Sequence, residues 1–274
     1  MVWNFDPILV NFGPLKIHYY GVIFATGIFI GYLLWRWQMI RQGFSEQETE
    51  DFVIWAFLAV IIGARLGHCF FYEPSYYLSH PIEIFAFWKG GLASHGAAIA
   101  LLLVLYAYHR AKKIPLLKIC DCFSFAAAVG AIAGRIGNFF NSEIVGRVTN
   151  VAWAVKFPRY ARMMGYSNVQ PRHPSQLYEV FLGIVVLSTL LLTDRKYGKN
   201  RPTGLLGGLF LVVYFSGRFI VEFFKEYQAL VQYSPQTQMQ EPTFALTMGQ
   251  LLSIPFILAG IVLVYKALHH SEEK

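Results

Sequence analysis

The chain has 274 residues, of which 55% are hydrophobic, 17% aromatic and only 14% charged, whereas a soluble domain carries about 25% charged residues. Together with a mean hydropathy of +0.44, this composition excludes disorder, a collagen-like fibre and an ordinary soluble enzyme, and it indicates an integral membrane protein. The net charge is +7, but no basic stripe with interleaved aromatic residues and no zinc-ligand spacing accompanies it, so the excess suits loops facing anionic lipid and not a nucleic-acid partner.

Seven apolar segments follow one another along the chain, each about long enough to cross a bilayer. We expect transmembrane helices at residues 17–35, 52–72, 90–109, 122–142, 175–193, 203–224 and 242–265. The segments after the first, third, fifth and seventh spans carry 12 Lys and Arg residues, against 8 on the other side. By the positive-inside rule, the N-terminus lies outside and the C-terminus in the cytoplasm. The sequence therefore predicts an all-α, seven-helix integral membrane fold.

The only sizeable predicted loop lies between the fourth and fifth spans, at residues 143–174. In its stretch from Ala152 to Phe157, the hydrophobic character of the residues alternates enough to predict a short strand. We expect this loop to form a small extracytoplasmic cap, inserted in a single membrane domain that spans residues 1–274.

Charged and polar residues occur inside the predicted spans, and the predicted topology puts them all at one depth, just under the outer surface. They are Tyr20, Arg65, His95, Arg135, Glu179, Arg218 and Glu222. A charge at the bilayer centre costs about 2.5 to 3.5 kcal/mol on insertion scales, so such groups are usually paired and functional. The alternative is that each Arg reaches to the headgroups, but this does not explain Glu and His at the same depth.

The outer end of the fourth span combines a cation, an amide and several glycines. Arg135 and Asn138 are three residues apart and share a helix face, and Gly134 and Gly137 expose the backbone beside them. A guanidinium group next to an amide and bare backbone suits an anionic oxygen cluster such as phosphate.

Three other spans carry related pairs or single groups. In the sixth span Arg218 and Glu222 are four residues apart, so the carboxylate can orient the guanidinium group, although a plain intrahelical ion pair is the alternative. In the fifth span Gln176 and Glu179 share a face. His95 opens the third span after a glycine pair and a serine, as a candidate proton acceptor or a hydrogen-bonded structural histidine.

These motifs resemble those of the bacterial phosphatidylglycerol:prolipoprotein diacylglyceryl transferases. The resemblance is carried by the signature Gly-Arg-x-Gly-Asn-Phe-x-Asn-x-Glu-x-x-Gly at 134–146, by His-Pro-Ser-Gln-Leu-Tyr-Glu at 173–179, and by the elements around Tyr20, Arg65, His95 and Arg218. It covers about residues 17 to 265 in the family's order. Residues 147–172 and the C-terminal tail are not matched.

The resemblance implies transfer of the diacylglyceryl group of phosphatidylglycerol to the lipobox cysteine thiol of a prolipoprotein, with release of glycerol phosphate. His95, with a reference pKa of about 6.5, can accept the thiol proton, and Arg135 and Arg218 can stabilise charge on the departing phosphate. No metal or cofactor is expected. The candidate catalytic residues are His95, Arg135, Arg218, Glu143 and Tyr20, and the candidate substrate-binding residues are Arg135, Asn138, Gly134, Gly146, Glu222, Arg65, Gln176 and Glu179.

Two questions stay open at this level. The proton acceptor is His95, Glu143, Glu222 or water. The rival function is a seven-helix transporter or receptor for an anionic lipid or solute, which would use the same Arg residues to bind. Charges deep in the inner half of the spans would favour the rival, but here they crowd toward one side, which favours an enzyme open to one leaflet.

Overall fold

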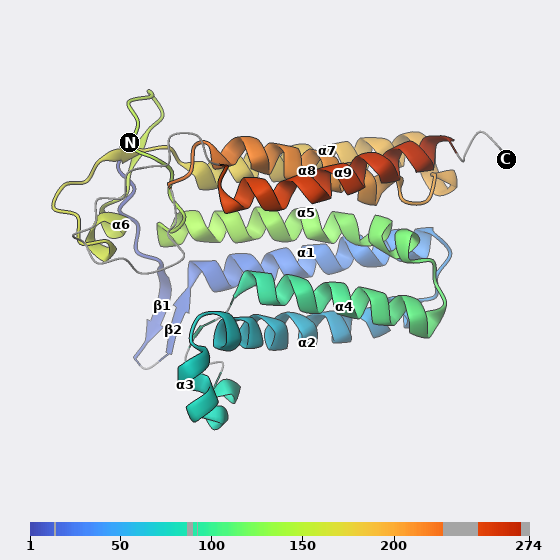
Figure 1. The fold of residues 1–274 in the computed structure, drawn as a ribbon, viewed down its shortest axis with the longest axis horizontal. Helices are drawn as coiled ribbons and strands as arrows, with labels where there is room; N and C mark the ends of the chain where they lie inside the picture. The colour runs from blue at the N-terminus through green and yellow to red at the C-terminus, as the bar shows by residue number, and fades with distance from the viewer. Residues whose placement is uncertain (14, 87–89, 92, 227–245, 270–274) are drawn as a thin grey trace. The chain divides into compact units, whose positions relative to one another are not determined.

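The computed structural model describes residues 1–274 except residues 14, 87–89, 92, 227–245 and 270–274, and this described part is mainly helical (Figure 1). The helices are α1 (Tyr19–Arg41), α2 (Glu46–Phe71), α3 (Pro74–Ser79), α4 (Ser94–Lys112), α5 (Leu116–Asn141), α6 (Pro158–Met163), α7 (Ser175–Tyr197), α8 (Leu205–Glu222) and α9 (Met248–His269), with the short 3₁₀ helices η1 (Pro81–Phe85) and η3 (Gly198–Asn200). The strands are β1 (Ile8–Phe12), β2 (Leu15–His18), β3 (Val155–Lys156) and β4 (Pro171–Arg172).

Within the described residues, six helices are long and apolar enough to cross a membrane, namely α1, α2, α5, α7, α8 and α9. These six coincide with expected spans, so the chain is a multi-pass membrane protein. The third expected span corresponds to α4, whose 19 residues include His95, Tyr106, Tyr108, His109 and Arg110 and are not among the six. Residue 92 of that span and residues 242–245 of the seventh lie outside the described residues. The seventh membrane crossing therefore stays a prediction.

The beginning of the first span differs from the expectation. Residues 17 and 18 belong to strand β2, which pairs antiparallel with β1, and helix α1 begins only at Tyr19. The turn between the strands contains Gly13 at φ +71°, a left-handed conformation that glycine adopts without strain. The helix prediction was wrong here because absence of charge was its only criterion, and this criterion does not separate the end of a short apolar strand from the first turn of a helix.

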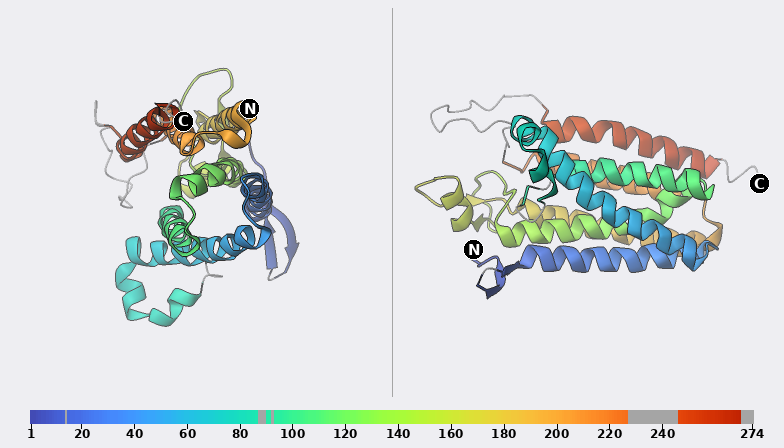
Figure 2. Two further views of the ribbon diagram at one scale, coloured as in Figure 1. Left: turned by 90° about the vertical axis from the view of Figure 1, so that its right-hand side faces the viewer. Right: turned by 90° about the horizontal axis from the view of Figure 1, so that it is seen from below.

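The chain forms two compact units, one of residues 1–31 and 124–274 and the other of residues 32–123. In the first unit α7, α8 and α9 lie side by side, and Figure 2 shows α8 against α9 from two further directions. Glycines allow this close packing: Gly217 of α8 faces Leu182 of α7, and Gly208 of α8 faces Val264 of α9.

The second unit is built around the pair α2 and α4. Their backbones approach closely, since a Cβ placed on Gly67 of α2 would lie 2.7 Å from the Gly96 Cα of α4. Elsewhere in this unit, Trp35, Phe52 and Tyr108 belong to a buried aromatic cluster. Small residues at the crossing thus permit the close approach, and the aromatic cluster fills the space beyond it.

Residues 143–174 contain the sheet β3–β4 and helix α6. The expected short strand is confirmed at Val155–Lys156, although it is only two residues long. The N-terminus extends this sheet, because Val2 pairs with Lys156 and the Trp3 amide donates to the Lys156 carbonyl at 2.8 Å. The loop is therefore folded against the first residues of the chain.

Candidate active site

Glu179, in the first turns of α7, is at the centre of a partly buried group of charges in the first unit. It is 3% exposed. Its Oε2 pairs with Arg135 Nε of α5, and its Oε1 pairs with Lys225 Nζ, just beyond the end of α8. Each oxygen of this carboxylate therefore faces its own cation.

Two charged residues of α8 complete the group. Glu222 Oε2 lies 3.4 Å from Lys225 Nζ. Arg218, one turn earlier, interacts electrostatically with Glu179, Glu222 and Tyr214. We call Arg135, Glu179, Arg218, Glu222 and Lys225 the ionic cluster. With three cations and two carboxylates, it carries one surplus positive charge.

Asn138 links Arg135 to a third carboxylate, that of Glu143. Arg135 Nη1 donates to Asn138 Oδ1 at 3.3 Å, and Asn138 Nδ2 donates to Glu143 Oε2 at 3.4 Å. Asn141 Nδ2 donates to the other oxygen of Glu143 at 3.1 Å. The amides of the signature thus orient both a guanidinium group and a carboxylate.

The backbone around Glu143 is held in an uncommon conformation. Ser142 and Ile144 both have positive φ, at 58° and 53°, and such angles are strained for residues with a side chain, most of all a β-branched one. The start of α7 stabilises this turn, because Gln176 Nε2 donates to the Glu143 carbonyl at 2.6 Å and Ser175 Oγ donates to the Ile144 carbonyl at 2.9 Å. Gln176 therefore acts on the backbone of Glu143.

Three signature glycines differ in their surroundings. A Cβ on Gly146 would lie 2.5 Å from the His173 carbonyl oxygen and 2.6 Å from that of Phe224. A Cβ on Gly137 would overlap the ring of Tyr20, whose hydroxyl interacts electrostatically with Glu143 and Arg135. A Cβ on Gly134 would meet no described atom within 4 Å. Gly146 and Gly137 thus serve close packing, and Gly134 leaves open space.

Arg65 lies in the second unit, where it binds backbone carbonyl groups. It is 4% exposed. Its guanidinium group donates to the carbonyl oxygens of Glu83 at 2.6 Å, Ile84 at 2.9 Å, Gly90 at 2.6 Å and Gly91 at 3.3 Å. These bonds tie the segment between α3 and α4 to the end of α2. The contacts of Arg65 are those of a residue that positions this segment, and its substrate-binding role stays a prediction.

His95, also in the second unit, is exposed at the beginning of α4. Its ring lies edge-to-face with Phe71, at 5.1 Å between centroids, and tilted against Tyr72 at 5.6 Å. These neighbours come from the end of α2. They hold the ring from one side and leave it accessible, as a proton acceptor requires.

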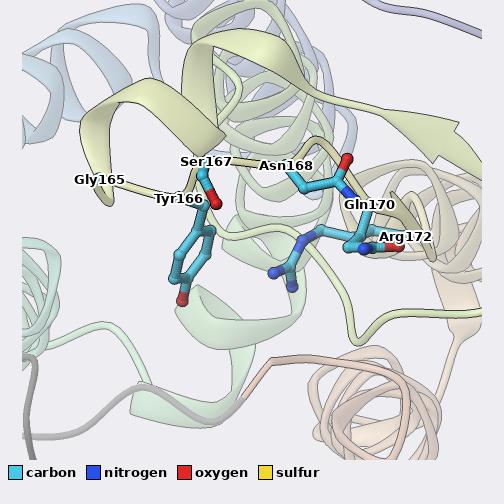
Figure 3. Close-up of a pocket in the computed structure, with 6 residues that line it drawn as sticks. All are labelled: Gly165, Tyr166, Ser167, Asn168, Gln170 and Arg172. Carbon is cyan, nitrogen blue, oxygen red and sulfur yellow. The ribbon is translucent and has the colours of Figure 1, made fainter.

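Arg172 of β4 ties the loop 143–174 to the residues after α8. Its Nη1 pairs with Glu226 Oε1 at 2.8 Å and donates to the Gly146 carbonyl at 3.1 Å. Tyr160 donates to the other oxygen of Glu226, and burial and this hydrogen bond raise the pKa of Tyr160. Arg172 also lines an open pocket of about 390 Å³, together with Gly165, Tyr166, Ser167, Asn168 and Gln170 (Figure 3).

The structure thus brings together most of the predicted site residues. Arg135, Asn138, Glu143, Gln176, Glu179, Arg218 and Glu222 form one connected set, with Tyr20, Gly134 and Gly146 on its border. Lys225 was missed, because it counted only as a charge of the outer loops. Its spacing of three residues from Glu222 was the available signal. Burial lowers the pKa of Lys225, and the nearby Glu179 acts in the opposite direction.

Comparison with known proteins adds independent information. The family model of prolipoprotein diacylglyceryl transferase matches residues 7–266. The chain is 40% identical to the phosphatidylglycerol–prolipoprotein diacylglyceryl transferase of Tolumonas auensis, over 96% of each chain. The enzymes of the same name from Bordetella avium and Chloroherpeton thalassium are 39% and 38% identical, covering 95% and 98% of this chain and 94% and 95% of their own.

Proposed function

Since the chain belongs to the prolipoprotein diacylglyceryl transferase family, we propose that it transfers the diacylglyceryl group of phosphatidylglycerol to the lipobox cysteine thiol of prolipoproteins. The observation that carries this proposal is the similarity to the named relatives over nearly the whole length of both chains. The ionic cluster supports it, because the guanidinium groups of Arg135 and Arg218 suit the oxygens of a phosphate.

The reaction replaces one bond to the glyceryl carbon by another. The cysteine sulfur attacks the carbon that carries the phosphate ester oxygen, so a C–S bond forms and the C–O bond breaks. The electron pair of the broken bond remains on the phosphate, which leaves as glycerol phosphate. The thiol proton passes to a base and from there to solvent or the leaving phosphate. The products are the thioether-linked lipid and glycerol phosphate, with no change of oxidation state.

Arg135 and Arg218 stabilise the phosphate as its negative charge grows. Both belong to a cluster that carboxylates and amides already orient, so little reorganisation is needed during the reaction. Glu179, Glu222 and Asn138 hold these arginines in place. Gly134 leaves room for the headgroup, Gly146 and Gln176 shape the turn at Glu143, and Tyr20 borders the phosphate.

The substrate thiol needs a proton acceptor, because a thiol with a pKa of about 8.5 is mostly protonated at neutral pH. We assign this role to His95, an accessible imidazole. Glu143, Glu222 and water are the alternatives. Mutation of His95 and the pH dependence of the rate distinguish them, as described in the Discussion.

We place the protein in the bacterial cytoplasmic membrane with seven spans, α4 being the third. The N-terminus and the cap 143–174 lie outside, and the C-terminus lies in the cytoplasm. The Lys and Arg distribution supports this orientation. Its hydrophobic helices are in contact with the bilayer, from which phosphatidylglycerol enters.

The test is a transfer assay with defined substrates. Purified protein is incubated with phosphatidylglycerol vesicles and a lipobox peptide, and the peptide is analysed by mass spectrometry. We expect a mass increase of one diacylglyceryl group on the cysteine and equimolar glycerol phosphate. A transporter or receptor would bind the lipid and leave the peptide unmodified, and that result would exclude the transferase.

A further inference from the structure

We propose that Lys225 is a positioning residue for the transfer reaction. Its ammonium group shares the Glu179 carboxylate with Arg135, and this sharing leaves the charge of Arg135 available to the substrate phosphate. The proposal rests on the proposed function. The Lys225 ammonium group pairs with the carboxylates of Glu179 and Glu222, so its side chain acts through these two residues.

The division of the Glu179 carboxylate is the first observation. Oε2 faces Arg135 and Oε1 faces Lys225, so the negative charge is shared between two cations. If Arg135 were the only partner, both oxygens could turn to its guanidinium group in a bidentate pair, which is the strongest arrangement of these groups. The phosphate would then compete with Glu179 for the same donors.

The burial of Lys225 is the second observation. The residue is 8% exposed, although lysine is almost never fully buried unless it is paired. A buried ammonium group costs several kcal/mol unless its partners compensate it, as Glu179 and Glu222 do here. A surface lysine chosen for solubility would not occupy this place.

The backbone of Lys225 is held independently of its side chain. Gly146 pairs with Lys225 in an antiparallel bridge, and Arg147 Nε donates to the Lys225 carbonyl at 2.9 Å. The Lys225 amide donates to the Glu222 carbonyl at 3.3 Å. Replacement of the side chain therefore tests the ammonium group and leaves these backbone connections intact.

The experiment compares four variants in the transfer assay: Lys225→Met, Lys225→Arg, Glu179→Gln, and the double variant that combines Glu179→Gln with Lys225→Met. We expect Lys225→Met to lower kcat by up to about 100-fold, the scale of a misplaced catalytic group, with a smaller change in KM. Lys225→Arg should recover most of the rate, because it restores a cation. The double variant should lose less than the product of the two single losses, because Glu179→Gln removes the charge that Lys225 balances.

The matched control is Lys156→Met, which removes an exposed positive charge from strand β3 of the same unit. It should leave the rate unchanged, and all variants should be checked for equal thermal unfolding temperatures. Unchanged kcat in Lys225→Met, failure of Lys225→Arg to restore the rate, or multiplicative losses in the double variant would overturn the inference. An inactive unmutated protein would instead refute the proposed function itself.

Discussion

Arg135 is held at two positions of its guanidinium group, at Nε by Glu179 and at Nη1 by Asn138. These two contacts fix the plane of the guanidinium group and therefore the directions of its other N–H donors. A point charge on a flexible chain has no such plane. The geometry of the residue, and not only its charge, therefore enters the proposed chemistry.

The first prediction separates geometry from charge. Arg135→Lys and Arg218→Lys keep the charge but lose the planar fork of donors that, in the proposed mechanism, binds two phosphate oxygens. Each should lower kcat by roughly 100-fold to 1,000-fold, as removal of one oxyanion donor does. Binding of phosphatidylglycerol should weaken less, because the interaction grows in the transition state.

Steady-state kinetics with a lipobox peptide and a vesicle-binding assay measure the two effects. Arg195→Lys, at the exposed far end of α7, is the matched control and should keep the full rate. Near-normal turnover of both cluster variants would show that the arginines act only as diffuse charge, and the proposed clamp would have to be abandoned.

The second prediction concerns His95. His95→Gln should lower turnover by roughly 100-fold to 10,000-fold, the range of general base catalysis. The loss should shrink as the pH rises toward the thiol pKa of about 8.5, because more thiolate is then present without a base. Rates of the two proteins measured across this pH range give the ratio directly.

His80→Gln is its control, since His80 is an exposed histidine of the same unit. It should behave like the unmutated protein at every pH. If His95→Gln has a small effect that is independent of pH, the proton acceptor is another group, and His95 only packs against Phe71 and Tyr72.

At the scale of elements, the loop between α5 and α7 is joined to the residues after α8 by two layers of contacts. In the first, Gly146 lies between the backbones of His173 and Phe224. In the second, Arg172 pairs with Glu226. The turn at Glu143 thus depends on two segments that follow it by more than 25 residues in the sequence. Its strained angles at Ser142 and Ile144 persist because these neighbours hold them.

The third prediction follows from this packing. In Gly146→Ala the new methyl group would overlap two carbonyl oxygens that cannot move without breaking the loop. We expect a loss of about 1 to 3 kcal/mol in stability, the usual cost of overpacking, together with strongly reduced transfer. Thermal unfolding in detergent and the transfer assay measure both.

Gly130→Ala on α5 is the comparison, because a Cβ there would meet no described atom within 4 Å. It should be neutral or stabilise the helix by roughly 0.5 to 1 kcal/mol, since glycine is a poor helix residue. Equal unfolding temperatures for the two variants would contradict the close-approach role of Gly146.

At the scale of the whole molecule, the membrane orientation decides whether the site faces the lipids and prolipoproteins on the outer side. The fourth prediction tests it with single cysteines at two exposed positions of the first unit, Ser167→Cys in the loop 143–174 and Asn200→Cys in η3. A membrane-impermeant maleimide should label the first in intact cells and the second only after permeabilisation.

The unsubstituted protein, with its native Cys69, Cys120 and Cys122, gives the background labelling. Labelling of both new cysteines in intact cells would contradict the proposed topology. Labelling of Asn200→Cys alone in intact cells would indicate the opposite orientation in the membrane.

Much of the site was predictable from the sequence, because its charged residues occur inside apolar segments, where a charge in the bilayer costs free energy. Arg135, Glu179, Arg218 and Glu222 were recognisable as charges inside apolar segments, and they lie in one cluster. Lys225 was not, since lysine is common in loops, and its spacing from Glu222 does not predict its contact with Glu179. Likewise, no local pattern predicts that Arg65 binds carbonyl groups.

The sequence by itself determined that the chain is a membrane protein, that its fold is mainly helical, where six of the apolar helices lie and to which family it belongs. It could do so because hydropathy, charge and motif spacing are local properties of the chain. Only the tertiary structure decided that β1 and β2 form a hairpin before α1. It also showed that Gly146 is enclosed by two distant backbones and that Glu179 divides its oxygens between two cations. These features depend on which segments meet, and such meetings are set by packing over the whole fold.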